Sequence, residues 1–212
     1  MKKKLLAIAA LVPLISLGIS YGDDAKEEAT ENETGSRNFF TIDGEGNLER
    51  PKAFREWVFM GTPLTPNDMN NGKATFPEFH NVYIDPVSFK EYKETGKFRD
   101  GTIIVKEMVS VGSKAAASGA GYFMGEFVGL EATIKSSEHF PDEPGNWAYF
   151  SFTDLVAKEL KELAKPFPAA ACNACHDAVA QDDFVFTQYY PVMRAAKGYG
   201  EGNPEETSER PF

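Results

Sequence analysis

The stretch RDGTIIVKEMVSV, residues 99–111, predicts a β-strand at the centre of the chain. Its first three residues have turn character, and the ten that follow are rich in β-branched side chains, which favour an extended backbone. Because side chains alternate along a strand, Ile104, Lys106 and Met108 would share one face, with the amine between two apolar neighbours. Taken alone, Lys106 is an ordinary strand lysine with a packed stem and an ammonium in water.

Segments of strand composition lie on both sides of this stretch. They span residues 79–85, 121–135 and 146–152. In the second segment Phe127, Gly129 and Glu131 would share a face, although a bulge would break this alternation. Glycines on that face would leave room for a large flat group, whereas Glu131 taken alone is a solvated strand glutamate. Together the segments predict a β-rich, antiparallel centre.

Helical patterns flank the predicted strands. The best-marked helix follows Asp85 as N-cap, with Pro86 at its first position and Gly96 as its stop. The spacing of apolar residues also predicts helices within residues 51–61 and 155–164. With a helical C-terminal part, these elements predict a single α+β domain, not a four-helix bundle.

Both cysteines of the chain lie in CNACH, residues 172–176, within the C-terminal part. C-x-x-C-H is the spacing of c-type haem attachment, in which two thiols form thioethers with the vinyl groups and the adjacent histidine reaches the iron. We therefore expect one haem c per chain, covalently held by Cys172 and Cys175, with His176 as the iron ligand.

Three other interpretations of this motif were weighed. A thioredoxin-like redox pair lacks its βαβ context, a zinc half-site lacks a second cysteine pair, and a disulfide over this short spacing would be strained. The motif does not decide what occupies the sixth iron position, because electron carriers fill it with Met or His and catalytic haems leave it free. The candidates are His80, His139, Met60, Met69, Met108, Met124 and Met193.

The two ends of the chain differ from its middle. Residues 1–22 combine three lysines, a short apolar run and small residues at the end, which predicts a signal peptide and export to the periplasm without a membrane anchor after cleavage. Cleavage would change the formal net charge from −10 to −13. Residues 23–37 and 198–212 are acidic and expected to be flexible, which leaves a haem domain at 38–197. This acidity argues against nucleic-acid binding.

Five segments between residues 47 and 197 closely resemble the cytochrome P-460 family, in the same order and nearly without gaps. They are FREWVFMGTPLTPNDMNNGKA, VYIDPVSFKEYKETGKFRDGTIIVKEMVSVG, GYFMGEFVGLEA, EPGNWAYFSF and CNACH…FVFTQYYPVMRAAK. Members are periplasmic mono-haem c-type cytochromes. The resemblance implies a β-rich homodimer that binds hydroxylamine and nitric oxide, oxidises hydroxylamine to nitrous oxide, and passes electrons to a soluble cytochrome c. The alternatives are a nitric-oxide-binding protein like cytochrome c prime beta and a simple electron-transfer cytochrome.

The resemblance also implies roles for individual residues. In the family a lysine is bonded to a meso carbon of the porphyrin, and the match at TIIVKEMVS assigns this bond to Lys106. The family also has a carboxylate on the open side of the haem that acts as a catalytic proton relay. The match at FVGLEA assigns this role to Glu131, with Phe127 as an apolar wall. Relatives have arginine where this chain has His80, which would alter proton supply if it lies near that side.

Overall fold

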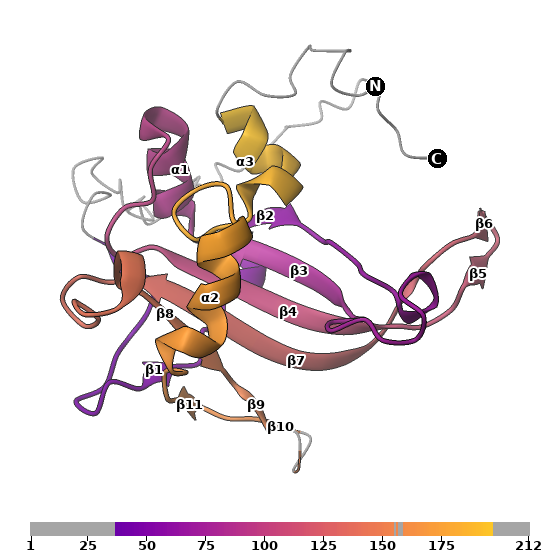
Figure 1. Ribbon diagram of the computed structural model, residues 1–212, viewed down its shortest axis with the longest axis horizontal. Helices are drawn as coiled ribbons and strands as arrows, with labels where there is room; N and C mark the ends of the chain where they lie inside the picture. The colour runs from indigo at the N-terminus through magenta and orange to yellow at the C-terminus, as the bar shows by residue number, and fades with distance from the viewer. Residues whose placement is uncertain (1–36, 155, 157–158, 197–212) are drawn as a thin grey trace, which may run out of the picture. The chain divides into compact units, whose positions relative to one another are not determined.

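The computed structural model describes residues 37–154, 156 and 159–196. Its centre is a five-stranded sheet in the order β2-β3-β4-β7-β8, in which every neighbouring pair is antiparallel (Figure 1). The strands are β2 (Val58–Gly61), β3 (Phe79–Ile84), β4 (Ile103–Val111), β7 (Met124–Lys135) and β8 (Trp147–Ser151). The expected signal peptide and the acidic tail lie outside the described residues.

Shorter strands form three small two-stranded pairs beside the main sheet. They are β1 (Leu48–Glu49) with β11 (Leu163–Ala164), β9 (Thr153–Asp154) with β10 (Glu159–Leu160), and β5 (Ala115–Ala116) with β6 (Gly119–Ala120). The β5–β6 hairpin joins β4 to β7 and has exposed small residues.

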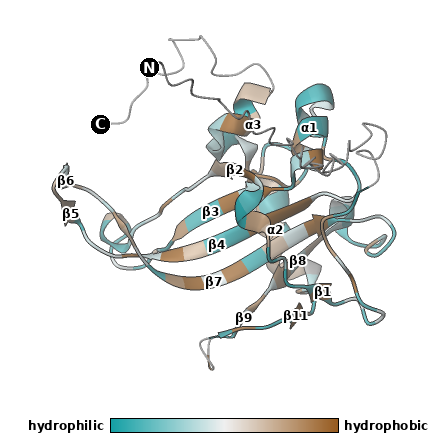
Figure 2. Cartoon of the chain, turned by 180° about the vertical axis from the view of Figure 1, so that it is seen from behind, coloured by the Kyte–Doolittle hydropathy of each residue, from teal (hydrophilic) through white to brown (hydrophobic). Residues whose placement is uncertain are grey.

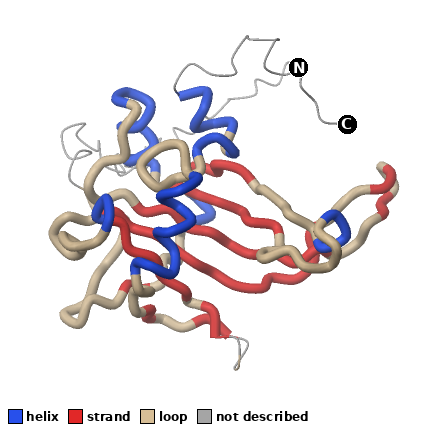
Figure 3. Tube along the Cα trace, viewed as in Figure 1, coloured by secondary structure: helices blue, strands red, loops and turns tan. Residues whose placement is uncertain are grey.

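Helices lie against one face of the sheet (Figure 3). They are α1 (Pro86–Thr95), α2 (Ala169–Val179) and α3 (Pro191–Ala196), with short 3-10 turns at Phe54–Glu56, Asn67–Met69, Pro144–Asn146 and Thr187–Tyr189. The β-rich centre with flanking helices confirms the predicted α+β class. Among the described residues, no helix combines the length and apolar character that crossing a membrane requires.

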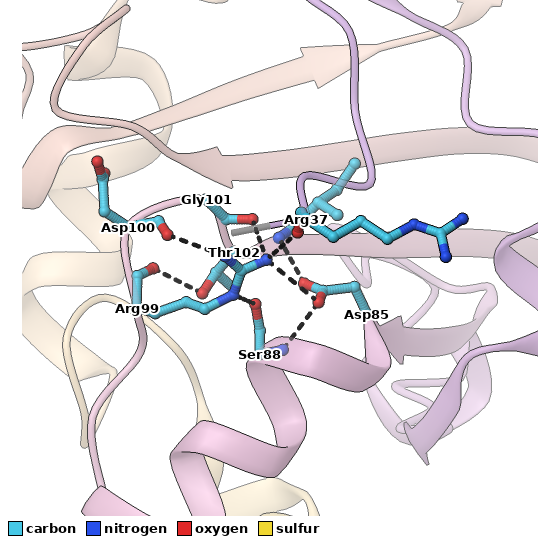
Figure 4. A network of polar contacts seen from close by, with 8 residues as sticks. Arg37, Asp85, Ser88, Arg99, Asp100, Gly101 and Thr102 are labelled. Atoms are coloured by element: carbon cyan, nitrogen blue, oxygen red, sulfur yellow. Dashed lines mark hydrogen bonds and ion pairs between the residues drawn. The ribbon is translucent and has the colours of Figure 1, made fainter. Parts of the chain in front are cut away.

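The predicted caps of α1 are confirmed, and the N-cap residue Asp85 belongs to a buried polar network (Figure 4). Asp85 accepts a hydrogen bond from the Ser88 backbone N–H at 2.8 Å, and Gly96 ends the helix in the left-handed conformation. Asp85 also accepts from the Ile103 backbone N–H at 3.1 Å, and Arg99 donates to the Ser88 hydroxyl at 2.9 Å. The network therefore ties α1 to the start of β4.

Two apolar cores pack on opposite faces of the sheet. The core away from the helices contains Leu48, Phe54, Ile103, Val105, Leu130, Ala132, Ile134, Phe140, Ala148, Phe150, Phe152 and Ala164. The core beneath the helices contains Met60, Val82, Ile84, Tyr92, Phe98, Ile104, Trp147, Tyr149, Val185, Tyr190 and Met193, with Cys172 packed against it. Figure 2 shows stretches of hydrophobic residues along the central strands, as burial on both faces favours.

Two of the predicted helices are wrong. Within residues 51–61 only a short 3-10 turn forms, and the chain then enters β2, because Val58 and Phe59 pair with β3. The described part of residues 155–164 forms β10 and β11. The two residues between these strands also use their backbone groups outside a helix: Lys161 N–H donates to Phe152 O, and Arg50 N–H donates to Glu162 O, each at 2.8 Å. Strand pairing thus outweighs local helix propensity.

The alternation predicted along residues 123–131 is also wrong. Met108 pairs with Gly129, but Val109 pairs with Phe127, so the register shifts between them. Val109 follows Met108 directly, so the two side chains point to opposite faces of the sheet. Because directly paired residues share a face, Phe127 lies on the face of Val109, which is opposite the face of Glu131. A side chain at Gly129 would meet Met108 Cε at 2.9 Å and overlap Thr153, so the chain itself fills the space expected for a flat group.

Candidate functional site

Lys106 and Glu131 form an ion pair on the helix-covered face of the sheet. They are directly paired across β4 and β7, and Lys106 Nζ lies 2.6 Å from Glu131 Oε2. Their side chains are 26% and 31% exposed, so both heads remain accessible from outside the protein. The register thus joins a potential nucleophilic amine and a potential proton acceptor that lie 25 residues apart in the sequence.

Phe76 and His80 complete this part of the site. Lys106 Nζ lies 5.1 Å from the centroid of the Phe76 ring, and the ring of His80 meets Phe76 edge-on at 5.8 Å. His80 pairs with Met108 across β3 and β4, which puts it diagonally beside Lys106. Burial, and secondarily the charge of Lys106, lower the pKa of His80 to about 4, so its ring is neutral at neutral pH.

The C-x-x-C-H residues lie on α2, which contacts β8 on the same face as the ion pair (Figure 1). Helical spacing brings Cys172, Cys175 and His176 onto one side of the helix within about one turn. Both thiols are free, and no disulfide joins them. Burial raises the pKa of Cys172; Glu131 raises it further, whereas Lys106 lowers it. A raised pKa disfavours the thiolate that a redox pair would need.

The ring of His176 is held in one orientation. Its Nδ1 lies 2.7 Å from the carbonyl oxygen of Phe184, which can only accept, so Nδ1 carries the proton and donates. The ring lies between Tyr149 and Phe186, with centroid distances of 4.8 and 4.7 Å. Burial lowers the pKa of His176, which favours the neutral ring. Nε2 therefore keeps its lone pair for a metal, as in histidine ligands oriented by a backbone carbonyl.

A strained turn supplies the carbonyl that orients His176. Asp183 and Phe184 have φ of 41° and 64°, in the left-handed region that non-glycine residues adopt at a cost. Asp183 is fixed to the sheet by Lys135 at 3.0 Å and by a hydrogen bond from Trp147 Nε1 at 3.2 Å. These contacts compensate for the strain and couple the turn after α2 to strands β7 and β8.

Several buried polar atoms on α2 and on the side of the sheet that it covers have no hydrogen-bond partner within the described residues. They are His80 Nε2, the Tyr149 hydroxyl, and both amide atoms of Asn173 in the C-x-x-C-H motif. Buried polar groups are normally paired, so these atoms leave hydrogen-bonding capacity on this face for a bound group. The described residues gather no set of three or more His, Cys, Asp or Glu able to hold a metal ion. A haem needs only one such ligand, because it brings four nitrogens of its own.

The residues therefore fit a covalently held haem. Cys172 and Cys175 are free thiols at thioether spacing, and His176 presents an unengaged Nε2. The sequence identified these residues, together with Lys106 and Glu131. It missed Phe76, Tyr149 and the Asp183–Phe184 turn, which nothing local marks as part of a site. The alternating aromatic residues of FVF, 184–186, were the only local feature near the turn.

Comparison with known proteins agrees with this geometry. A family model described as Cytochrome P460 matches residues 51–187. No curated protein matches the chain significantly. Because the family match covers more than half of the sequence, the chain belongs to the cytochrome P460 family and is a haem cytochrome.

Proposed function

From this family membership we propose that the protein is a mono-haem c-type cytochrome that oxidises hydroxylamine to nitrous oxide. Cys172 and Cys175 hold the haem through thioethers, and His176 Nε2 is the iron ligand. The observation that carries the proposal is the Lys106–Glu131 pair, 2.6 Å apart on the sheet face that α2 covers. When bound, the haem supplies an iron centre that takes up hydroxylamine and accepts its electrons.

Glu131 is the proposed proton acceptor. Two hydroxylamine molecules give nitrous oxide, one water, four protons and four electrons, so every turnover requires proton removal beside the ligand. A partly exposed carboxylate can take a proton and pass it to solvent. The electrons leave to a soluble cytochrome.

Lys106 is the proposed site of the bond to the porphyrin. An amine attached to an aromatic carbon carries no charge at neutral pH, so the bond would release Glu131 from its ion pair and free the carboxylate to accept protons. The second candidate is a nitric-oxide-binding protein like cytochrome c prime beta, which would keep the thioethers but lack the lysine bond. A strongly red-shifted ferrous Soret band of the purified protein would support the lysine bond, and an ordinary high-spin spectrum would support the second candidate.

The test of the catalytic role compares Glu131→Gln with wild type in steady-state hydroxylamine oxidation with an artificial acceptor. Loss of a general base lowers the rate by about 10²–10⁴-fold, so turnover should fall steeply while hydroxylamine still binds. Glu126→Gln is the matched control, because Glu126 is an exposed glutamate on the same strand. Turnover of Glu131→Gln within about threefold of wild type would remove Glu131 as the base.

Two further proposals concern the location and assembly of the protein. We propose cleavage after residue 22 with export to the periplasm, which the intact mass of protein from its native host tests. We also propose a homodimer, supported by exposed apolar side chains on or beside the sheet: Phe59, Met124, Phe127 and Val128 are 37–47% exposed. Light scattering of the haem-loaded protein measures its oligomeric state, and a monomer at all concentrations would contradict the dimer.

A further inference from the structure

His80 differs from the other two histidines of the chain in its hydrogen bonding. His139 Nδ1 lies 2.9 Å from the Ser136 hydroxyl, and His176 Nδ1 donates to Phe184 O. His80 Nε2 is shielded from solvent and has no partner within the described residues. Buried polar nitrogens are normally paired, so Nε2 is available to a partner that the described residues do not supply.

The position of His80 shows which side of the sheet this nitrogen faces. His80 pairs with Met108, and the next residue of β3 on the same face, Val82, pairs with Lys106. The rings of Phe76 and His80 are in contact, and Phe76 also supports Lys106 Nζ. His80 therefore faces the same side of the sheet as Lys106 and Glu131, which is the side that carries α2.

We infer that His80 is a positioning residue, whose neutral imidazole holds a small nitrogen–oxygen ligand at the haem through a hydrogen bond from or to Nε2. The inference rests on the haem site of the proposed function, but it does not require hydroxylamine oxidation. Glu131 and His80 would then have different roles at the haem. The carboxylate removes protons, and the uncharged ring orients the ligand without adding charge beside Lys106.

The chemistry of the ring suits this role. Burial and the nearby Lys106 charge lower the pKa of His80 to about 4, so one nitrogen carries a proton and the other carries a lone pair at neutral pH. Hydroxylamine, nitric oxide and azide can each accept a hydrogen bond, and hydroxylamine can also donate one. A positively charged side chain here would repel the Lys106 ammonium before the proposed bond forms, and the neutral ring avoids that repulsion.

Two variants test the inference in the haem-loaded protein. His80→Phe removes both nitrogens but keeps a ring against Phe76, and His80→Gln keeps a polar group. His139→Gln is the matched control, because His139 is an exposed histidine with its partner on a surface turn. Azide is the probe for the ferric protein, because it binds haem iron without being turned over, so the result is independent of catalytic activity.

We expect azide to bind about threefold to tenfold more weakly to His80→Phe, the effect of losing one neutral hydrogen bond, with His80→Gln closer to wild type and His139→Gln unchanged. The spin state of the ferric protein should not change. Equal azide affinity in wild type and both His80 variants would overturn the inference. A low-spin wild type that becomes high-spin in His80→Phe would also overturn it, because His80 would then bind the iron itself. Failure of the proposed function alone would leave the azide result intact.

Discussion

Two buried or partly buried polar clusters of this chain contrast in how completely they are paired. In the network around Asp85 and Arg99, the carboxylate accepts two backbone N–H groups, and Arg99 donates to Ser88 and to several carbonyl oxygens (Figure 4). On the Lys106 face, by contrast, His80 Nε2, the Tyr149 hydroxyl and the Asn173 amide have no partner within the described residues.

This difference distinguishes polar groups that stabilise the fold from polar groups that are available to bind a ligand. A cluster that satisfies itself needs nothing from outside, and its loss should appear as lost stability. A cluster with unpaired buried atoms is complete only when another molecule binds, and its loss should appear as lost function. Substitutions in the first cluster should therefore lower stability, and substitutions in the second should lower function with little loss of stability.

The largest effect on stability is expected from the self-satisfied network. Asp85 is fully buried and Arg99 is 8% exposed, with Arg99 Nη2 3.7 Å from Asp85 Oδ1. Arg99→Met leaves the Asp85 charge buried without its cation, which should lower the free energy of unfolding by about 3–5 kcal/mol. Urea unfolding of the haem-loaded protein measures this, with Lys97→Met as an exposed control. A loss below about 1 kcal/mol would show that the network is not structural.

A smaller effect on stability is expected from Asp183. This residue contributes both to the fold and to the haem site, because it holds the turn that orients His176. Asp183→Ala removes the acceptor of Trp147 Nε1 and the partner of Lys135, so the free energy of unfolding should fall by about 1–2 kcal/mol. The reduction potential should rise, because a loosened hydrogen bond to Phe184 O makes His176 a less basic ligand. Potentiometric titration checks this against Asp177→Ala on the exposed side of α2; an unchanged potential would contradict the coupling.

Glu131→Gln is expected to cost less stability still, despite its large effect on turnover. The Lys106–Glu131 pair is partly exposed on both sides, and such ion pairs contribute about 0–1 kcal/mol. Urea unfolding of the Glu131→Gln and Glu126→Gln proteins should therefore give nearly the same free energy. A loss as large as that of Arg99→Met would mean that Glu131 builds the fold and would erase the distinction between the clusters.

At neutral pH the smallest effect on stability is expected from His80, whose contribution appears only as the pH falls. Its pKa is about 4 in the fold and 6.5 in the unfolded chain, so the unfolded chain binds more protons between these values. Stability should therefore fall as the pH falls from about 6.5 to about 4, and level off below. His80→Phe should flatten this part of the curve of urea midpoint against pH. An identical slope in both proteins would exclude His80 as its source.

Local sequence patterns predicted the elements whose boundaries are set by nearby residues. Asp85, Pro86 and Gly96 fix both ends of α1, and the β-branched run 103–111 forms β4 as expected. The patterns failed at 51–61, where β3 supplies the backbone partners, and at 155–164, where β10 pairs with the nearby β9 and β11 pairs with the distant β1. Nothing in the local sequence indicates those strand pairings, so the helical spacing of apolar residues in the two segments was misleading.

The site divides in the same way. Cys172, Cys175 and His176 are recognisable because their chemistry depends on spacing along one helix. The pairing of Lys106 with Glu131 depends on the register of β4 with β7, and a bulge in that pair moved Phe127 to the opposite face. The contacts of His176 with Tyr149 and Phe184 bring together three separate segments, which only the folded chain reveals.

The most direct test of the central claim, that α2 and the Lys106 face hold one haem between them, is tryptic mass spectrometry of the haem-loaded protein. A modified Lys106 resists trypsin, so we expect residues 100–114 as one peptide, joined through a single haem to the peptide 162–194 that contains Cys172 and Cys175. Recovery of the free peptide 100–106 from protein active in hydroxylamine oxidation would contradict the claim that this lysine is bonded to the haem.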